Sequence, residues 1–71
     1  MKTIGEAIQK LRLDKELTQE ELAIKADVSY TSLVKIERDQ VKNPTIKTLK
    51  KLADALEVSV DEILSLVENN N

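Results

Sequence analysis

Residues 18–38, TQEELAIKADVSYTSLVKIER, decide the fold, because they encode two short helices joined by a very short link. Thr18 is followed three residues later by Glu21, the spacing at which a hydroxyl and a carboxylate cap each other's backbone N–H groups. Ser29 opens the second helix, so the chain leaves one helix and enters the next within about four residues. Two helices this close must cross steeply, and the outer face of the second helix is then left free.

The rest of the chain repeats this pattern of capped, amphipathic segments. Residues that suit a helix N-cap stand at five positions: Thr3, Thr18, Ser29, Thr45 and Ser59. Apolar residues at helical spacing follow the first, fourth and fifth caps: Ile4, Ala7, Ile8 and Leu11; Ile46, Leu49, Leu52, Ala53 and Leu56; Val60, Ile63, Leu64 and Val67. No apolar alternation at period two is sustained, so strands are not expected. The sequence predicts one all-α domain of five helices over residues 1–68, with a polar end at 69–71 that frays.

Length and composition exclude several function classes. A chain of 71 residues makes one small domain, with no room for a deep catalytic cleft. It contains no cysteine and no histidine, hence no thiolate nucleophile, no soft metal ligand and no proton shuttle active at neutral pH. We therefore expect neither an enzyme nor a cofactor or metal site. The absence of cysteine fits a reducing cytoplasm, and no apolar run approaches the roughly 18 residues that a membrane span requires.

The net charge of -2 and the pI near 5.1 by themselves argue against a nucleic-acid-binding protein. The distribution of charge changes this interpretation. Residues 1–51 hold all 11 basic groups against 8 acidic ones, a net charge of +3, whereas residues 52–71 hold 5 acidic groups and no basic one. A chain polarised in this way can turn one surface toward phosphates and keep its acidic end pointed away.

Within residues 18–38, two sets of side chains separate by their spacing. The inward set is Leu22, Ala23, Ala26, Val28, Leu33 and Ile36, and the outward set is Tyr30, Thr31, Val34, Lys35 and Arg38. With these residues in place, the chain resembles the Cro and phage-repressor-like (Xre-type) family of helix-turn-helix regulators. The likeness runs from Ile4 to Leu64 and includes the stretches LTQEELA, VSYTSLVKIER and NPTIKTLKKLADALEVSVDEIL. It implies a lambda-repressor-like fold and a transcriptional regulator, typically a repressor, that binds specific double-stranded DNA sequences.

The resemblance also implies roles for individual residues. The second helix of the pair, Ser29 to Arg38, is expected in the DNA major groove, where base contacts fall to Tyr30, Thr31 and Lys35. Val34 either meets a thymine methyl group or packs at the helix periphery. The DNA backbone is expected to contact Thr18, Gln19, Ser32, Arg38, Lys42 and Asn43. Simpler roles are helix capping for Thr18 and a solvated loop for residues 42–43.

Two further features follow from the same likeness. Arg12 and Glu37 stand at the positions of a partly buried ion pair that ties the first helix to the end of the DNA-reading helix. Asp27, Asp39 and Glu57 stand at helix ends where the family commonly has glycine. Asp27 and Asp39 would also bring negative charge near the expected DNA face.

Members of this family bind inverted-repeat operators as two-fold homodimers. The last helix is the expected dimer interface, with Ile63, Leu66 and Val67 as candidates, unless Ile63 and Val67 only close the monomer core. The rival interpretation is an antitoxin-like or adaptor protein, whose acidic C-terminal half holds a toxin or effector protein. Neither interpretation involves a membrane.

Overall fold

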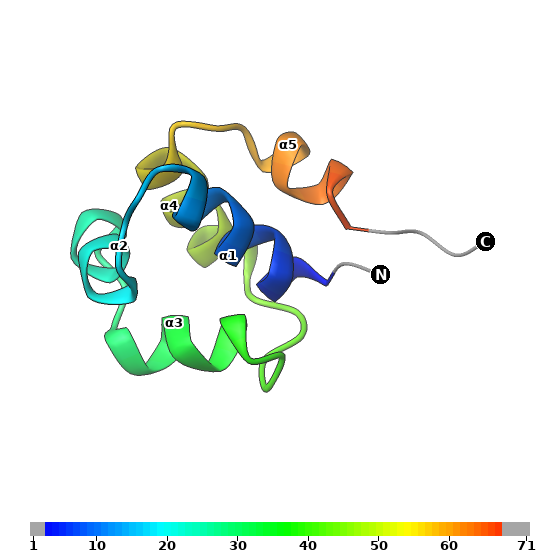
Figure 1. Ribbon diagram of the computed structural model, residues 1–71. Coiled ribbons are helices and arrows are strands. Elements are labelled where there is room, and N and C mark those ends of the chain that lie inside the picture. Colours follow the sequence, from blue (N-terminus) through cyan, green and yellow to red (C-terminus); the bar gives the residue numbers. More distant parts are fainter. Residues whose placement is uncertain (1–2, 68–71) are drawn as a thin grey trace.

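The computed structural model describes residues 3–67, which form five α-helices and no strand within that range (Figure 1). The helices are α1 (Ile4–Asp14), α2 (Gln19–Ala26), α3 (Tyr30–Glu37), α4 (Ile46–Leu56) and α5 (Val60–Ser65). The predicted all-α class and the number of helices are therefore confirmed. The predicted polar end at residues 69–71 lies outside the described residues.

Each helix begins directly after the hydroxyl residue predicted to cap it. The reciprocal capping boxes are present at the starts of α1, α2 and α5. At the start of α2, the hydroxyl of Thr18 accepts a hydrogen bond from the Glu21 N–H at 3.0 Å, and the Glu21 carboxylate accepts one from the Thr18 N–H at 2.8 Å. Each such cap contributes about 1 kcal/mol to stability. In a chain with so small a core, the five caps therefore determine where the helices begin.

Left-handed backbone conformations end several of these helices. Glu16, Asp27, Asp39 and Glu57 all have φ between 57° and 63°. Three of them are the positions where the sequence carries an acid in place of a glycine. Aspartate tolerates this conformation better than glutamate, so the strain is greatest at Glu16 and Glu57.

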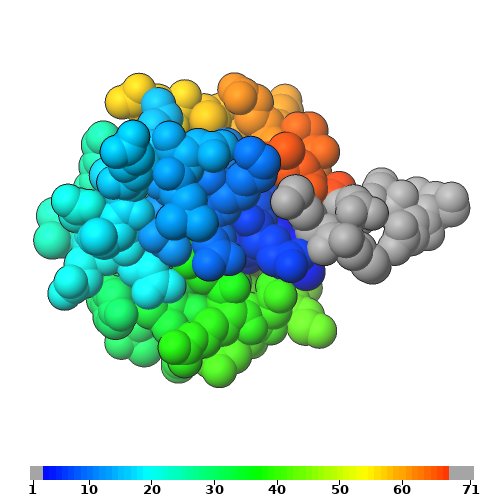
Figure 2. Space-filling view, in the orientation of Figure 1, coloured from blue at the N-terminus to red at the C-terminus, as the bar shows by residue number. Residues whose placement is uncertain are grey.

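The core lies where the helices converge, with α1 in contact with α3, α4 and α5. The largest fully buried side chains are Ile8, Leu22, Leu33, Leu52, Leu56 and Ile63. Figures 1 and 2 show α3 along the lower side of the molecule and α5 along the upper side, with α1 between them. Helix α3 and the acidic helix α5 therefore lie on opposite sides of α1.

Two apolar residues assigned to inward faces are exposed instead. Ile46 is 75% exposed, because it is the first residue of α4 and its helix turn extends beyond the core. Leu64 is 44% exposed within α5, whereas Leu66 and Val67, just beyond the helix, are half-buried against the core. None of the described helices is long and apolar enough to cross a membrane.

Candidate nucleic-acid interface

The outer face of α3 carries the predicted DNA-reading residues. Tyr30, Thr31, Ser32 and Lys35 are exposed, and Val34 is half-buried. On the opposite face, Leu33 and Ile36 are buried in the core. The helix is therefore fixed along one side and presents an aromatic ring, hydroxyl groups and an ammonium group to solvent along the other.

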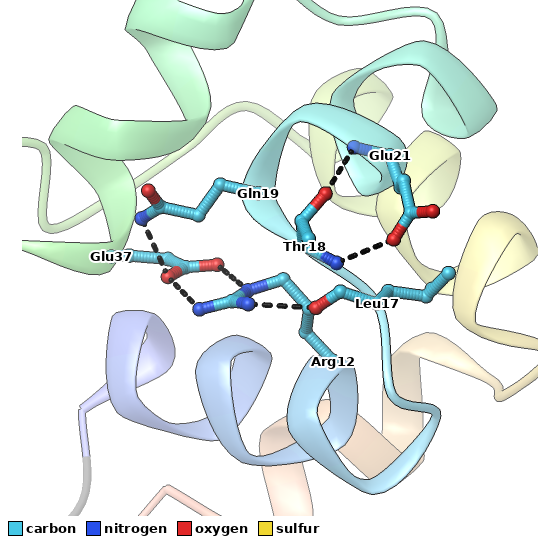
Figure 3. A network of polar contacts seen from close by, with 6 residues as sticks. All are labelled: Arg12, Leu17, Thr18, Gln19, Glu21 and Glu37. Carbon is cyan, nitrogen blue, oxygen red and sulfur yellow. Dashed lines mark hydrogen bonds and ion pairs between the residues drawn. The ribbon is translucent and has the colours of Figure 1, made fainter.

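A buried carboxylate holds the C-terminal end of α3 in place (Figure 3). Glu37 Oε2 accepts a hydrogen bond from Arg12 Nε at 2.8 Å, and Glu37 Oε1 accepts one from the other end of the same guanidinium at 3.0 Å. The Glu37 side chain is 2% exposed and that of Arg12 is 9% exposed. The third guanidinium nitrogen donates to the Leu17 carbonyl at 2.8 Å, so this ion pair also fixes the link between α1 and α2.

Gln19 adds α2 to the same site, because its amide nitrogen donates to Glu37 Oε1 at 3.0 Å. Figure 3 shows Gln19, Glu37 and Arg12 pointing toward one another from three different helices. The structure thus brings together the two predicted ion-pair residues and Gln19, which was predicted as a contact to the DNA backbone. Thr18 lies next to them and serves as the N-cap of α2, which is the simpler of its two predicted roles.

Beyond α3 the chain turns sharply and runs along the same side of the molecule. Asp39 takes a left-handed conformation with φ of 63°, and the N–H groups of Gln40 and Val41 both donate to the Lys35 carbonyl at 2.9 and 3.2 Å. Lys42 and Asn43 follow and are exposed. A shallow groove of about 320 Å³ lies between α3 and the start of α4, lined among others by Lys35, Asn43 and Thr48.

Gly5 is a residue of this site that the sequence interpretation missed. A side chain at Gly5 would overlap the Ile36 carbonyl oxygen and would approach Glu37 Cα to 3.2 Å. The absence of a Cβ therefore lets the first turn of α1 pack directly on the end of α3. The available signal was that this glycine, the only one in the chain, stands inside a predicted helix.

The two acidic residues at the C-terminal end of α3 make contacts within the protein. Glu37 is paired with Arg12, and one carboxylate oxygen of Asp39 accepts a hydrogen bond from the Thr3 hydroxyl at 2.6 Å. Asp39 thus makes a specific contact in addition to the negative charge expected of it, and Asp27 is exposed. Three cations, Lys35, Arg38 and Lys42, are exposed in residues 30–43, so this face is positive although the whole chain is acidic.

The three candidate dimer residues occupy different environments. Ile63 is fully buried within the single chain, so it closes the core and has no surface to offer to a second copy. Leu66 and Val67 are half-buried against the core. Leu64, which the sequence pattern assigned to the inward face, is the most exposed apolar residue of this end of the chain.

Comparison with known proteins matches this arrangement to one family. Residues 8–63 match the family model described as helix-turn-helix. The immunity repressor protein of Bacillus phage phi105 is 42% identical over 62 residues, which cover 87% of this chain and 42% of that protein. The transcriptional regulator SinR of Bacillus subtilis is 41% identical over 61 residues, which cover 86% of this chain and 55% of SinR. The chain thus spans about half the length of these curated relatives.

Solved structures agree with the sequence comparison. The crystal structure of SinR in complex with DNA superposes with a TM-score of 0.85 at 40% identity, covering 87% of this chain and 98% of that one. The DNA-binding domain of the P22 c2 repressor superposes with a TM-score of 0.83 at 25% identity, covering 99% of this chain and 92% of that one.

Proposed function

Because this chain belongs to the Cro and phage-repressor-like family of helix-turn-helix regulators, we propose that it binds specific double-stranded DNA sequences and acts as a transcriptional repressor. The observation that supports this most directly is the outer face of α3. It is polar, positively charged and free, while the inner face is held by the core and by the Glu37 contacts. A rigid helix with one free polar face is what insertion into a DNA major groove requires.

Base recognition is assigned to the first turns of α3. Lys35 donates to guanine O6 or N7, and Thr31 donates to a base edge, accepts from one or contacts a thymine methyl group. Tyr30 contacts a base or a phosphate from the first position of the helix. The half-buried Val34 contributes at most an apolar contact to a thymine methyl group.

The residues proposed to contact the DNA backbone lie around this helix, and two of them have an unused hydrogen-bond donor. Gln19 uses one amide N–H on Glu37, which leaves its second N–H for a phosphate oxygen. The Ser32 hydroxyl oxygen accepts a hydrogen bond from Ser29 at 2.7 Å, so the Ser32 proton is available to a phosphate. Lys42, Asn43, Arg38 and the N-terminus of α2 at Thr18 complete this set, which supplies affinity and register rather than base preference.

Two copies are proposed to bind together, because one domain of this size contacts too few base pairs for useful specificity. With Ile63 in the core, the dimer contact is assigned to Leu64 together with the half-buried Leu66 and Val67. Sedimentation of Leu64→Lys beside the unchanged protein tests this surface. A dimer that becomes a monomer supports it, and an identical mass for both proteins excludes it.

Selection from a pool of random duplexes at low salt tests the function itself. The expected product is an inverted repeat whose half-sites are separated by about one helical turn, roughly 10 base pairs. Binding of Lys35→Ala to the selected and to random duplexes then tests base reading, with Lys10→Ala on α1 as a control of equal charge change. Lys35→Ala should weaken selected sites by about 1 to 3 kcal/mol more than random ones. No enriched sequence would contradict DNA reading and favour the rival protein-binding role.

A further inference from the structure

The start of α1 and the end of α3 are joined by a hydrogen bond between residues 36 positions apart. The Thr3 hydroxyl donates to Asp39 Oδ1 at 2.6 Å, in a part-buried position. The same hydroxyl oxygen accepts the Glu6 N–H at 3.1 Å, so its donor and one acceptor position are both used. The side chain of Asp39 is thereby attached to the N-cap of α1, where the helix dipole favours a negative charge.

The surroundings of this hydrogen bond leave little freedom of movement. A Cβ on Gly5 would lie 2.9 Å from Asp39 Oδ1 and would overlap the Ile36 carbonyl oxygen. The first turn of α1 is therefore in direct backbone contact with the last turn of α3. The Asp39 carboxylate fills the space beside Gly5 and faces Thr3, away from solvent on that side.

Asp39 also determines the path of the loop that follows α3. Its left-handed backbone reverses the chain, and the next two N–H groups, those of Gln40 and Val41, return to the Lys35 carbonyl. Lys42 and Asn43 come directly after this turn, and Asn43 lines the groove beside α3. A shift of Asp39 relative to α1 would therefore also displace Lys42 and Asn43.

We propose that Asp39 is a positioning residue, which through its hydrogen bond to Thr3 sets the place of the loop 40–43 against α3 and so aligns the loop with the DNA backbone. This inference rests on the proposed DNA binding and adds a residue that itself touches no DNA. The Thr3–Asp39 contact requires a side chain that glycine, the common family residue at this position, does not have.

A simple charge effect of Asp39 and a positioning role of Asp39 predict different results for two substitutions. If Asp39 acts only as a negative charge near phosphates, then Asp39→Gly and Asp39→Asn should both tighten DNA binding by the same factor. If Asp39 positions the loop, the asparagine variant keeps an oxygen that accepts from Thr3, whereas the glycine variant does not. Both residues tolerate the left-handed backbone, so neither variant strains the backbone of residue 39 itself.

The experiment compares dissociation constants of the unchanged protein, Asp39→Gly and Asp39→Asn on the selected duplex and on a random duplex. We expect the glycine variant to bind both duplexes about tenfold more weakly than the asparagine variant, the equivalent of about 1.4 kcal/mol. The asparagine variant should bind at least as tightly as the unchanged protein. Equal affinities of the two variants would overturn the proposal.

Thr3 provides an independent arm of the same test. Thr3→Val removes the donor, and Thr3→Ser keeps both the donor and the helix cap. Thr3→Val also removes the α1 cap, so it should weaken DNA binding in both backgrounds, but less in the Asp39→Gly background, where the contact with Asp39 is already lost. Additive losses would overturn the proposal, since they would place the effects in separate contacts.

Hydrogen exchange in the free protein separates this inference from DNA binding itself. The Gln40 and Val41 amides should exchange about tenfold faster in Asp39→Gly than in Asp39→Asn, whereas amides in the middle of α4 should exchange equally in both. If the unchanged protein binds no duplex, the proposed function fails and the exchange rates alone decide whether Asp39 orders the loop. Equal rates in the two variants would refute that role.

Discussion

Replacement of Arg12 by alanine should remove a large part of the free energy that stabilises this fold. The guanidinium supplies two of the three hydrogen bonds that the buried Glu37 carboxylate receives, and the third comes from Gln19. Arg12→Ala would leave a carboxylate that is 2% exposed with a single neutral donor. An uncompensated buried charge of this kind costs about 3 to 5 kcal/mol. Because Gln19 still donates to Glu37 and water can enter the vacated space, we expect a loss of stability near the lower end of this range.

That loss is large relative to the total stability. A domain of 71 residues has a free energy of unfolding of roughly 4 to 11 kcal/mol at about 0.05 to 0.15 kcal/mol per residue. A loss of about 3 kcal/mol lowers the melting temperature of such a domain by roughly 12 to 24 °C, at about 4 to 8 °C per kcal/mol. Urea denaturation followed by circular dichroism of the helices measures the free energy directly.

Lys10 and Asp14 provide a matched control on the same helix. Their charged groups lie 3.0 Å apart, similar to the Arg12–Glu37 distance, but the side chains are 47% and 59% exposed. Lys10→Ala should therefore cost under about 0.5 kcal/mol. Equal losses from Arg12→Ala and Lys10→Ala would refute the reasoning, because burial would then have no effect.

A double variant identifies the source of the loss. If the unpaired charge is the cause, Arg12→Met combined with Glu37→Met should recover most of the stability, since an apolar pair of similar volume often equals a buried ion pair. If the double variant is as unstable as Arg12→Ala, the loss comes instead from the packing of the arginine side chain or from its hydrogen bond to the Leu17 carbonyl.

Three other changes test separate parts of the structure. Gly5→Ala should destabilise the fold by about 1 to 3 kcal/mol, because the new methyl group overlaps the Ile36 carbonyl. Gln9→Ala on the exposed side of α1 is the control and should change the stability by less than about 0.5 kcal/mol. Equal melting temperatures for the two variants would contradict the close packing of α1 on α3. Glu57→Gly should raise the free energy of unfolding by roughly 0.5 to 1 kcal/mol in urea denaturation, because glycine adopts the left-handed backbone without strain. The substitution removes only exposed ion pairs with Lys15 and Lys25. A lower stability would show that those pairs outweigh the strain. If Lys42 binds one phosphate, Lys42→Ala should weaken binding to all duplexes and make the slope of log affinity against log salt concentration shallower by about 1. An unchanged slope would exclude that interaction.

The sequence predicts the helix starts well, because a cap depends on residues three positions apart. Thr18 with Glu21 and Ser59 with Glu62 lie where local spacing places them. It also predicts the face of α3, since a helix with one apolar stripe has only one way to turn it inward. The Arg12–Glu37 pair came from the family resemblance rather than from spacing, because its partners are 25 residues apart.

The features that the sequence did not predict depend on distant parts of the chain. Gly5 is required by a carbonyl oxygen 31 positions later, and Asp39 is oriented by Thr3. Ile46 belongs to a helical apolar stripe, yet the first turn of α4 extends past the helices that would cover it. In α5 the apolar spacing continues beyond Ser65 although the helix ends there, and Leu64, which the spacing placed on the inward face, is exposed.

Tyr30 is the only aromatic residue in the sequence, and it lies half exposed in the first turn of α3. The intrinsic fluorescence and the near-ultraviolet circular dichroism of the protein therefore arise from one ring at one position. A change in the tyrosine fluorescence on adding a duplex, corrected for absorption by the bases, reports the surroundings of the first turn of α3. The molecule thus carries an optical probe on its proposed recognition helix, without any label that would alter the surface under study.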